Sequence, residues 1–77
     1  MRFYYQAMQL SPVSIDPNVM GGTPVFRGTR VPVRLLIDYL ESGDSIEYFL
    51  EGFPSVGRDQ VFAFLDLMSE KVAEIAH

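Results

Sequence analysis

Three arginines form the densest group of residues in this sequence that could bind a charged ligand. Arg27, Arg30 and Arg34 lie within eight positions, and no acidic residue occurs between Gly21 and Ile37. Guanidinium groups bind phosphate oxygens in a bidentate fashion, and such binding weakens as salt is added. The spacing therefore predicts a basic patch for an anionic partner such as double-stranded DNA.

An inward orientation of these arginines is the competing interpretation. Arg27 or Arg30 would then donate to loop carbonyls and pair with an acid such as Asp16 or Asp38, which would tie down a glycine-rich hairpin. Both interpretations stay open on the sequence alone.

Two polar residues near the start of the last predicted helix suit the reading of bases. Arg58 and Gln60 can each make paired hydrogen bonds to one base, guanine and adenine respectively. The first turn of a recognition helix meets base edges in the major groove. Asp59 and Asp66 on the same helix would repel phosphate, and DNA-binding domains are normally basic. Arg58 and Gln60 as capping and surface residues remain the alternative.

The sequence contains few residues that could take part in catalysis. The only histidine is the terminal His77, there is no cysteine, and no acid is spaced with a histidine to hold a metal. Gly21-Gly22 followed by Pro24 lacks the glycine spacing and the lysine of a phosphate-binding loop. We therefore expect no catalytic residues, no metal and no cofactor, since a small hydrolase would need a nucleophile or metal ligands that the chain does not offer. The remaining helix acids are interpreted as solvated surface: Asp38, Glu41, Glu47, Glu51, Asp66, Glu70 and Glu74.

Length and charge limit what the chain does alone. Its 77 residues form one domain, 1–77, with a small core that no disulfide supports, so a partner chain is expected to add stability. Residues 1–37 carry four arginines and one aspartate, a net charge of +3, whereas residues 38–77 carry nine acids and two basic residues, a net charge of -7. This asymmetry indicates a basic face and an acidic face.

Residues 1–32 are predicted to form short strands and a glycine-rich hairpin. Strands are expected at Phe3–Leu10 and Val13–Ile15, followed by a loop at 16–22. Val25–Phe26 and Thr29–Val31 are expected to pair around Arg27-Gly28, with Gly28 at a positive φ.

Residues 33–77 are predicted to form three helices. The first runs from Val33 to about Ser42 and is closed by Gly43, and Pro32 suits its first turn. Asp44 is expected to cap the second helix, with Glu47 three residues later. Gly52 and Pro54 end that helix, and a third starts near Arg58 with Gly57 as its cap and Gln60 at its third position. The fold class is therefore mainly α with a short N-terminal β segment, as a three-helix, helix-turn-helix bundle of the homeodomain-like or winged-helix-like kind.

Apolar residues cover much of the third helix. The main row has the spacing of a seam packed on other helices: Val61, Leu65, Met68, Val72 and Ile75. Phe62, Phe64 and Leu67 lie off this row and are predicted to form a dimer or partner interface. Their packing against the N-terminal strands of the same chain is the alternative.

Two stretches resemble a known bacterial family. "GGTPVFRGTRVPV" and "SGDSIEYFLEGFPSV", followed by an arginine that opens a final helix, are similar to domain of unknown function family four hundred and thirty-three, over about residues 14–70. The resemblance implies a helix-turn-helix bundle behind a short β segment, and members often look like antitoxins whose toxin is a PIN-like nuclease. No functional residues come with the family. Gly57 stands where members often have Thr, which weakens a helix cap slightly.

These features give two functional hypotheses. The first is a type II antitoxin, a homodimer that represses its own promoter by binding DNA and binds a PIN-like nuclease toxin through apolar and acidic surface. The second is a protein-interaction module without DNA affinity that dimerises through apolar helix surface. No apolar run approaches the length of a membrane span and no signal peptide is recognisable, so no membrane partner and a cytoplasmic location are expected.

Overall fold

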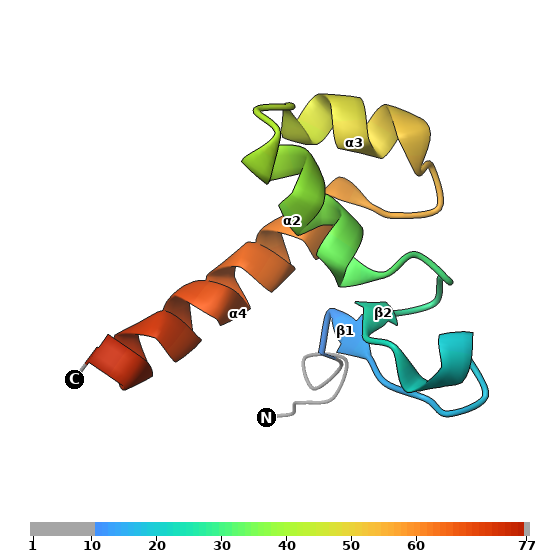
Figure 1. Cartoon of the computed structure of the whole chain (residues 1–77), viewed down its shortest axis with the longest axis horizontal. Coiled ribbons are helices and arrows are strands. Elements are labelled where there is room, and N and C mark those ends of the chain that lie inside the picture. The colour runs from blue at the N-terminus through green and yellow to red at the C-terminus, as the bar shows by residue number, and fades with distance from the viewer. Residues whose placement is uncertain (1–10, 77) are drawn as a thin grey trace, which may run out of the picture.

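The computed structural model describes residues 11–76, which fold into a mainly helical domain with a small antiparallel sheet (Figure 1). The elements follow in the order β1 (Val13–Ser14), the 3-10 turn η1 (Met20–Gly22), β2 (Val25–Phe26), α2 (Val33–Glu41), α3 (Ile46–Gly52) and α4 (Arg58–Ala76). The expected fold class is confirmed. The strand predicted at Phe3–Leu10 and the terminal His77 lie outside the described residues.

The β segment contains the predicted hairpin pairing and a second pairing that was not predicted. β2 pairs with β1, with Val13 opposite Phe26, and on its other side Val25 forms an antiparallel bridge with Pro32, one residue beyond the predicted partner Thr29–Val31. The tight turn itself is present: the Phe26 N–H donates to the Val31 carbonyl at 2.9 Å, and Gly28 has the expected positive φ of 80°. The pairing continues past Pro32, which has no N–H to donate, because the Val33 N–H donates to the Pro24 carbonyl at 3.1 Å.

Glycine closes α2 as expected. Gly43 has a φ of 86°, a conformation that glycine adopts without strain. Its N–H donates to the Leu40 carbonyl at 3.0 Å, and the Asp44 N–H donates to the Tyr39 carbonyl at 3.0 Å. These two bonds are the Schellman arrangement that satisfies the last carbonyls of a helix. Pro32 serves as the N-cap of α2 and is not its first helical residue.

The cap of α3 is Ser45, so the prediction of Asp44 is wrong by one residue. The Ser45 hydroxyl accepts from the Tyr48 N–H at 3.0 Å. The end of α3 at Gly52 agrees with the prediction.

The start of α4 matches the prediction closely. The Gly57 N–H donates to the side-chain carbonyl of Gln60 at 3.0 Å, which is half of a capping box. Val56 and Val61 on either side of the cap are both buried in the core, at the positions of a hydrophobic staple.

Phe26 lies at the centre of the core, between α3 and α4. Its ring centroid is 6.0 Å from that of Phe49 on α3 and 5.8 Å from that of Phe64 on α4, the second pair edge to face. Leu36 of α2 completes the buried cluster together with the two valines of the α4 cap. Phe64 is therefore a core residue with 2% of its surface exposed, and its predicted place in an interface is wrong. Phe64 follows Val61 by three residues, so both side chains lie on the same side of α4.

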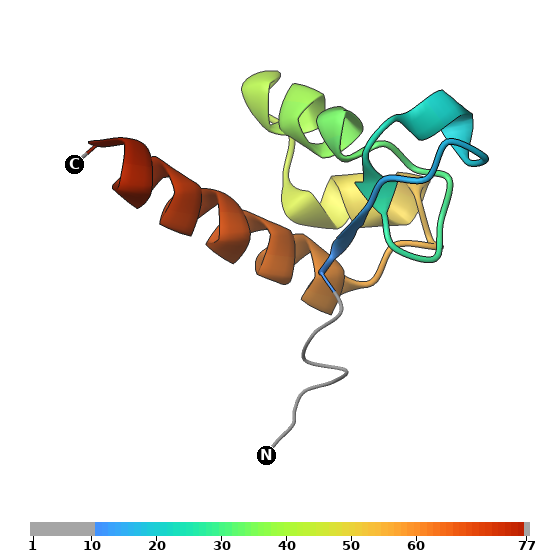
Figure 2. The same cartoon turned by 90° about the horizontal axis from the view of Figure 1, so that it is seen from below.

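The second half of α4 projects away from the rest of the domain (Figures 1 and 2). The main apolar row of this helix is fully buried at Val61, but Val72 is 63% exposed and Ile75 is 84% exposed. Among the residues that the structure describes, the row therefore packs against the core only where it begins. Within residues 11–76, none of the helices combines the length and the apolar character that crossing a membrane requires.

Candidate functional site

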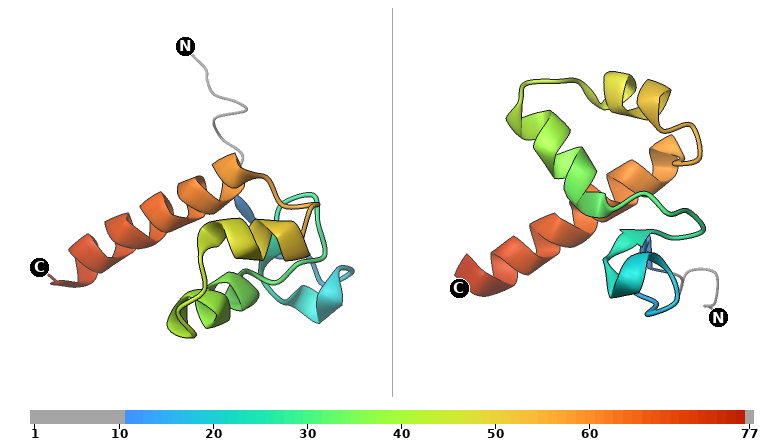
Figure 3. Two further views of the ribbon diagram at one scale, coloured as in Figure 1. Left: turned by 90° about the horizontal axis from the view of Figure 1, so that it is seen from above. Right: turned by 45° about the vertical axis from the view of Figure 1, so that its right-hand side comes forward.

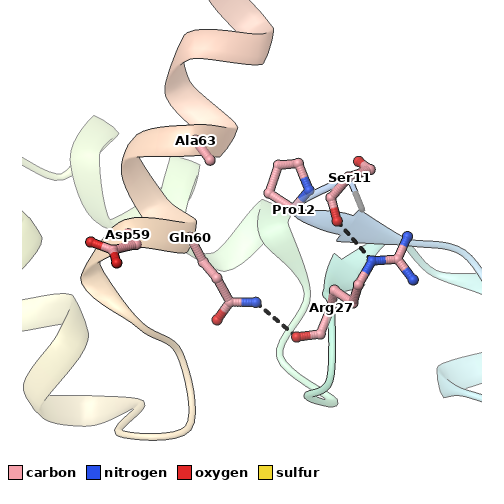
Figure 4. Close-up of a pocket in the computed structure, with 6 residues that line it drawn as sticks. All are labelled: Ser11, Pro12, Arg27, Asp59, Gln60 and Ala63. Atoms are coloured by element: carbon pink, nitrogen blue, oxygen red, sulfur yellow. Dashed lines mark hydrogen bonds between the residues drawn. The ribbon is translucent and has the colours of Figure 1, made fainter. Parts of the chain in front are cut away.

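Arg27 is half-buried and is bonded to the backbone of the β segment. Its Nε donates to the Ser11 carbonyl at 2.7 Å and its Nη2 donates to the Val13 carbonyl at 3.2 Å, as Figure 4 shows for the first bond. The side chain thus ties the turn after β2 to the segment that carries β1. The structure therefore agrees with the interpretation in which Arg27 donates to loop carbonyls. These bonds make the guanidinium less available to a phosphate group.

Gln60 connects the start of α4 to the same turn. Its Nε2 donates to the Arg27 carbonyl at 2.7 Å, while its Oε1 accepts from the Gly57 N–H. The amide is half-buried and both of its ends are engaged. The geometry therefore favours the capping interpretation over base reading.

Arg58 joins α4 to α3. Its Nη2 lies 2.5 Å from Oε2 of Glu47, and its Cζ lies 5.8 Å from the centroid of the Phe62 ring. The hydrogen bond from Arg58 lowers the pKa of the Glu47 carboxyl below its ordinary value of 4.5, with further lowering from a backbone hydrogen bond and the charge of Arg58. Arg58 is thus engaged on the protein surface.

The other two arginines of the predicted patch differ in their surroundings. Arg34 is exposed on α2 and pairs with Asp38 at 2.9 Å and with Glu41 at 3.5 Å. Arg30 is exposed in the turn, and within residues 11–76 its side chain forms no hydrogen bond or ion pair. The three arginines are therefore not equally available to a ligand, because Arg27 is bonded to loop carbonyls and Arg34 is paired with acids of its own helix.

A pocket of about 380 Å³ opens between the first turns of α4 and the segment before β1 (Figure 4). Its lining comprises Ser11, Pro12, Arg27, Asp59, Gln60 and Ala63. Arg27 and Gln60 are committed to backbone carbonyls, and the Asp59 carboxylate disfavours an anion. Among the described residues, no three side chains of His, Cys, Asp or Glu are grouped to hold a metal ion.

The projecting half of α4 has two unlike faces. One face continues the apolar row with exposed Met68, Val72 and Ile75, and Phe62 beside the row is 45% exposed. At 3.6 residues per turn, the acids of this helix fall on the opposite side: Asp59, Asp66, Glu70 and Glu74. The sequence prediction placed the interface on Phe62, Phe64 and Leu67. Phe62 is exposed and Leu67 is half-buried. The most exposed apolar side chains of α4 are Val72 and Ile75, which the sequence pattern predicted to be packed on other helices.

Helix length is the signal that would have located this surface. α4 has 19 residues, whereas α2 has nine and α3 has seven. A helix rises about 1.5 Å per residue, so two short helices cannot cover a long one along its length.

The family comparison agrees with the fold. The family model for "Protein of unknown function (DUF433)" matches residues 13–67. The chain belongs to this family. A crystal structure at 2.00 Å of a DUF433 member from Anabaena variabilis aligns with a TM-score of 0.69 and 27% identity, covering 91% of this chain and 69% of that one.

One curated relative is much longer than this chain. The uncharacterized protein y4eO of Sinorhizobium fredii is 43% identical over 49 residues, which is 64% of this chain. Those residues span only 22% of the length of y4eO. The DUF433 match ends before Met68, so the exposed end of the apolar row lies beyond the matched residues.

The ion pair between Arg58 and Glu47 generates a prediction about pH. A carboxyl whose pKa is lowered by folding stabilises the fold above its ordinary pKa, and that contribution is lost as the pH falls through the folded value. Substituting Arg58→Ala should raise the pKa of Glu47 towards 4.5, because the hydrogen bond that lowers it most is removed. Carboxyl NMR titration measures this directly. Arg34→Ala is the matched control, and an unchanged Glu47 titration in Arg58→Ala would refute the assignment.

Proposed function

We propose that this DUF433 protein is a non-catalytic interaction module that binds another protein chain through the apolar face of α4. The observation that carries this proposal is the continuous exposure of Met68, Val72 and Ile75 on a helix that projects from the domain. Contiguous exposed apolar surface on a small protein is typical of an interaction site. Burying a valine or isoleucine side chain contributes about 1.5–3 kcal/mol, so even three such residues provide useful affinity.

The distribution of charge supports a protein partner over a nucleic acid. The chain has a net charge of -4, and the acids of α4 would repel a phosphate backbone. The same acids lie opposite the apolar row, so they keep the helix hydrated without obstructing the face that binds.

Capture of partners from a lysate of the host cells tests this proposal with matched variants. The double substitution Val72→Gln and Ile75→Gln removes apolar surface, and Asp66→Gln with Glu70→Gln introduces the same two side chains on the opposite face. We expect the first variant to bind its partner at least about tenfold more weakly, because the free energy lost with the buried apolar surface exceeds about 1.4 kcal/mol. The second variant should match the unmodified chain.

Quantitative mass spectrometry of the retained proteins provides the readout. All four substituted positions are exposed, so both variants should unfold at the temperature of the unmodified chain. Retention of the same proteins in the same amounts by both variants would reject the proposal.

A type II antitoxin that also binds DNA is the second candidate, and one observation favours it. Arg30 is exposed in the turn before α2, and Arg34 is exposed in the first turn of that helix, within a three-helix arrangement. Such a protein would repress its own promoter as a dimer and bind a PIN-like nuclease. A basic nuclease would be attracted to the acidic face of α4.

Gel-shift titration with the DNA upstream of the gene tests this candidate. The complex at low salt should weaken in Arg30→Gln, and the slope of log affinity against log salt should fall by about one if the side chain contacts one phosphate. Lys71→Gln, on the projecting half of α4, is the control. Absence of any complex at low salt would eliminate the DNA-binding form of this hypothesis.

A further inference from the structure

We infer that the chain bound on the apolar face of α4 is a second copy of this protein, with the two α4 helices packed antiparallel. The inference rests on the proposed function, because it names the occupant of the same face. Three features of α4 lead to it: the spacing of its apolar row, the position of its charges, and the place where its own domain covers it.

The spacing of the apolar residues along α4 is typical of two helices that pack against each other. Apolar positions along α4 alternate by four and three residues from Val61 to Ile75, which is the pattern of a seam between two helices. Val61 is buried in the core and Leu65 packs against it, whereas Met68, Val72 and Ile75 continue the same row beyond the domain. A second α4 carries an identical row, so the two surfaces match in spacing through a twofold axis.

The charges permit two acidic chains to meet along this row. Ser69 and Lys71 flank the projecting part of the row, and neither is an acid. Lys71 is itself 3.8 Å from Glu74, within the same helix. Two copies therefore come together without opposing carboxylates, while a strongly basic partner would find no carboxylate beside the apolar residues. The charge pattern thus permits a second copy and offers no attraction to a basic chain.

The position of the rest of the domain determines that the two α4 helices run antiparallel. The start of the row faces the chain's own core, and the rest of the domain gathers at that end of α4 (Figures 2 and 3). A parallel copy would have to place its own α2 and α3 in the same space. An antiparallel copy places the two domains at opposite ends and brings only the projecting halves together, and this direction also suits the helix dipoles.

The register of the two α4 helices follows because only their projecting halves can meet. With the helices crossing near Glu70, Met68 of each copy lies opposite Val72 of the other, and each Ile75 reaches towards Leu65 at the edge of the other domain. Such a contact is smaller than the roughly 1,200–2,000 Å² that stable interfaces bury. The dimer is therefore expected to dissociate on dilution.

Sedimentation of the purified full chain measures the association. Between about 1 µM and about 1 mM, which spans the weak end of non-covalent affinity, the mass should rise from 8.7 kDa towards twice that value. The Val72→Gln and Ile75→Gln variant should raise the dissociation constant about tenfold or more. Asp66→Gln with Glu70→Gln should leave it unchanged.

Single cysteines determine the direction, because the chain has no cysteine of its own. A mixture of Met68→Cys and Val72→Cys chains should form the mixed disulfide faster than either chain links to itself. Preferential self-linking of both variants would overturn the antiparallel arrangement.

The outcomes separate this inference from the proposed function. A chain that stays monomeric up to 1 mM but captures a different protein through Val72 and Ile75 overturns the inference and leaves the function standing. A dimer that is insensitive to the double glutamine variant overturns the inference as well. Monomers that capture nothing through this row contradict both.

Discussion

Phe26 is the residue through which the short β segment holds the helices together. Its ring is fully buried and meets Phe49 of α3 and Phe64 of α4. The backbone around it is fixed from both sides, because Arg27 donates to the carbonyls of the segment before β2 and Gln60 donates to the Arg27 carbonyl. A two-stranded sheet is marginal by itself, so these contacts are what position it.

This constraint determines how much of α4 the domain can cover. Phe26 and Phe49 reach the first turns of the helix, where Val61 and Phe64 are buried. Beyond that point no other helix or strand within residues 11–76 packs along the row, and exposure rises along it to 84% at Ile75. The exposed surface is thus a consequence of a small core attached to one end of a long helix.

Several features of the fold were predictable because local chemistry decides them. Gly43 closes α2 through a positive φ, and Gln60 caps the start of α4, since few residue types satisfy either position. The family resemblance over residues 14–70 agrees with the match over 13–67.

The errors arose where the outcome depends on partners distant in sequence. The strand partner of Val25–Phe26 is β1, which a local hairpin pattern does not indicate. The Arg27 guanidinium is bonded to carbonyls fourteen and sixteen residues away, so its neighbours in sequence do not indicate its partners. Phe62 and Phe64 differ only by a rotation about α4, and the side of that helix that meets the core decides which is buried.

The central claim is that one half of α4 belongs to the core and the other half to a partner. Native-state amide hydrogen exchange measures this residue by residue. In dilute solution the amides around Val61 and Leu65 should be protected to nearly the free energy of global unfolding, while those around Val72 and Ile75 should exchange fast. Raising the concentration should then slow exchange in the second group alone. Equal protection of both halves at every concentration would contradict the account.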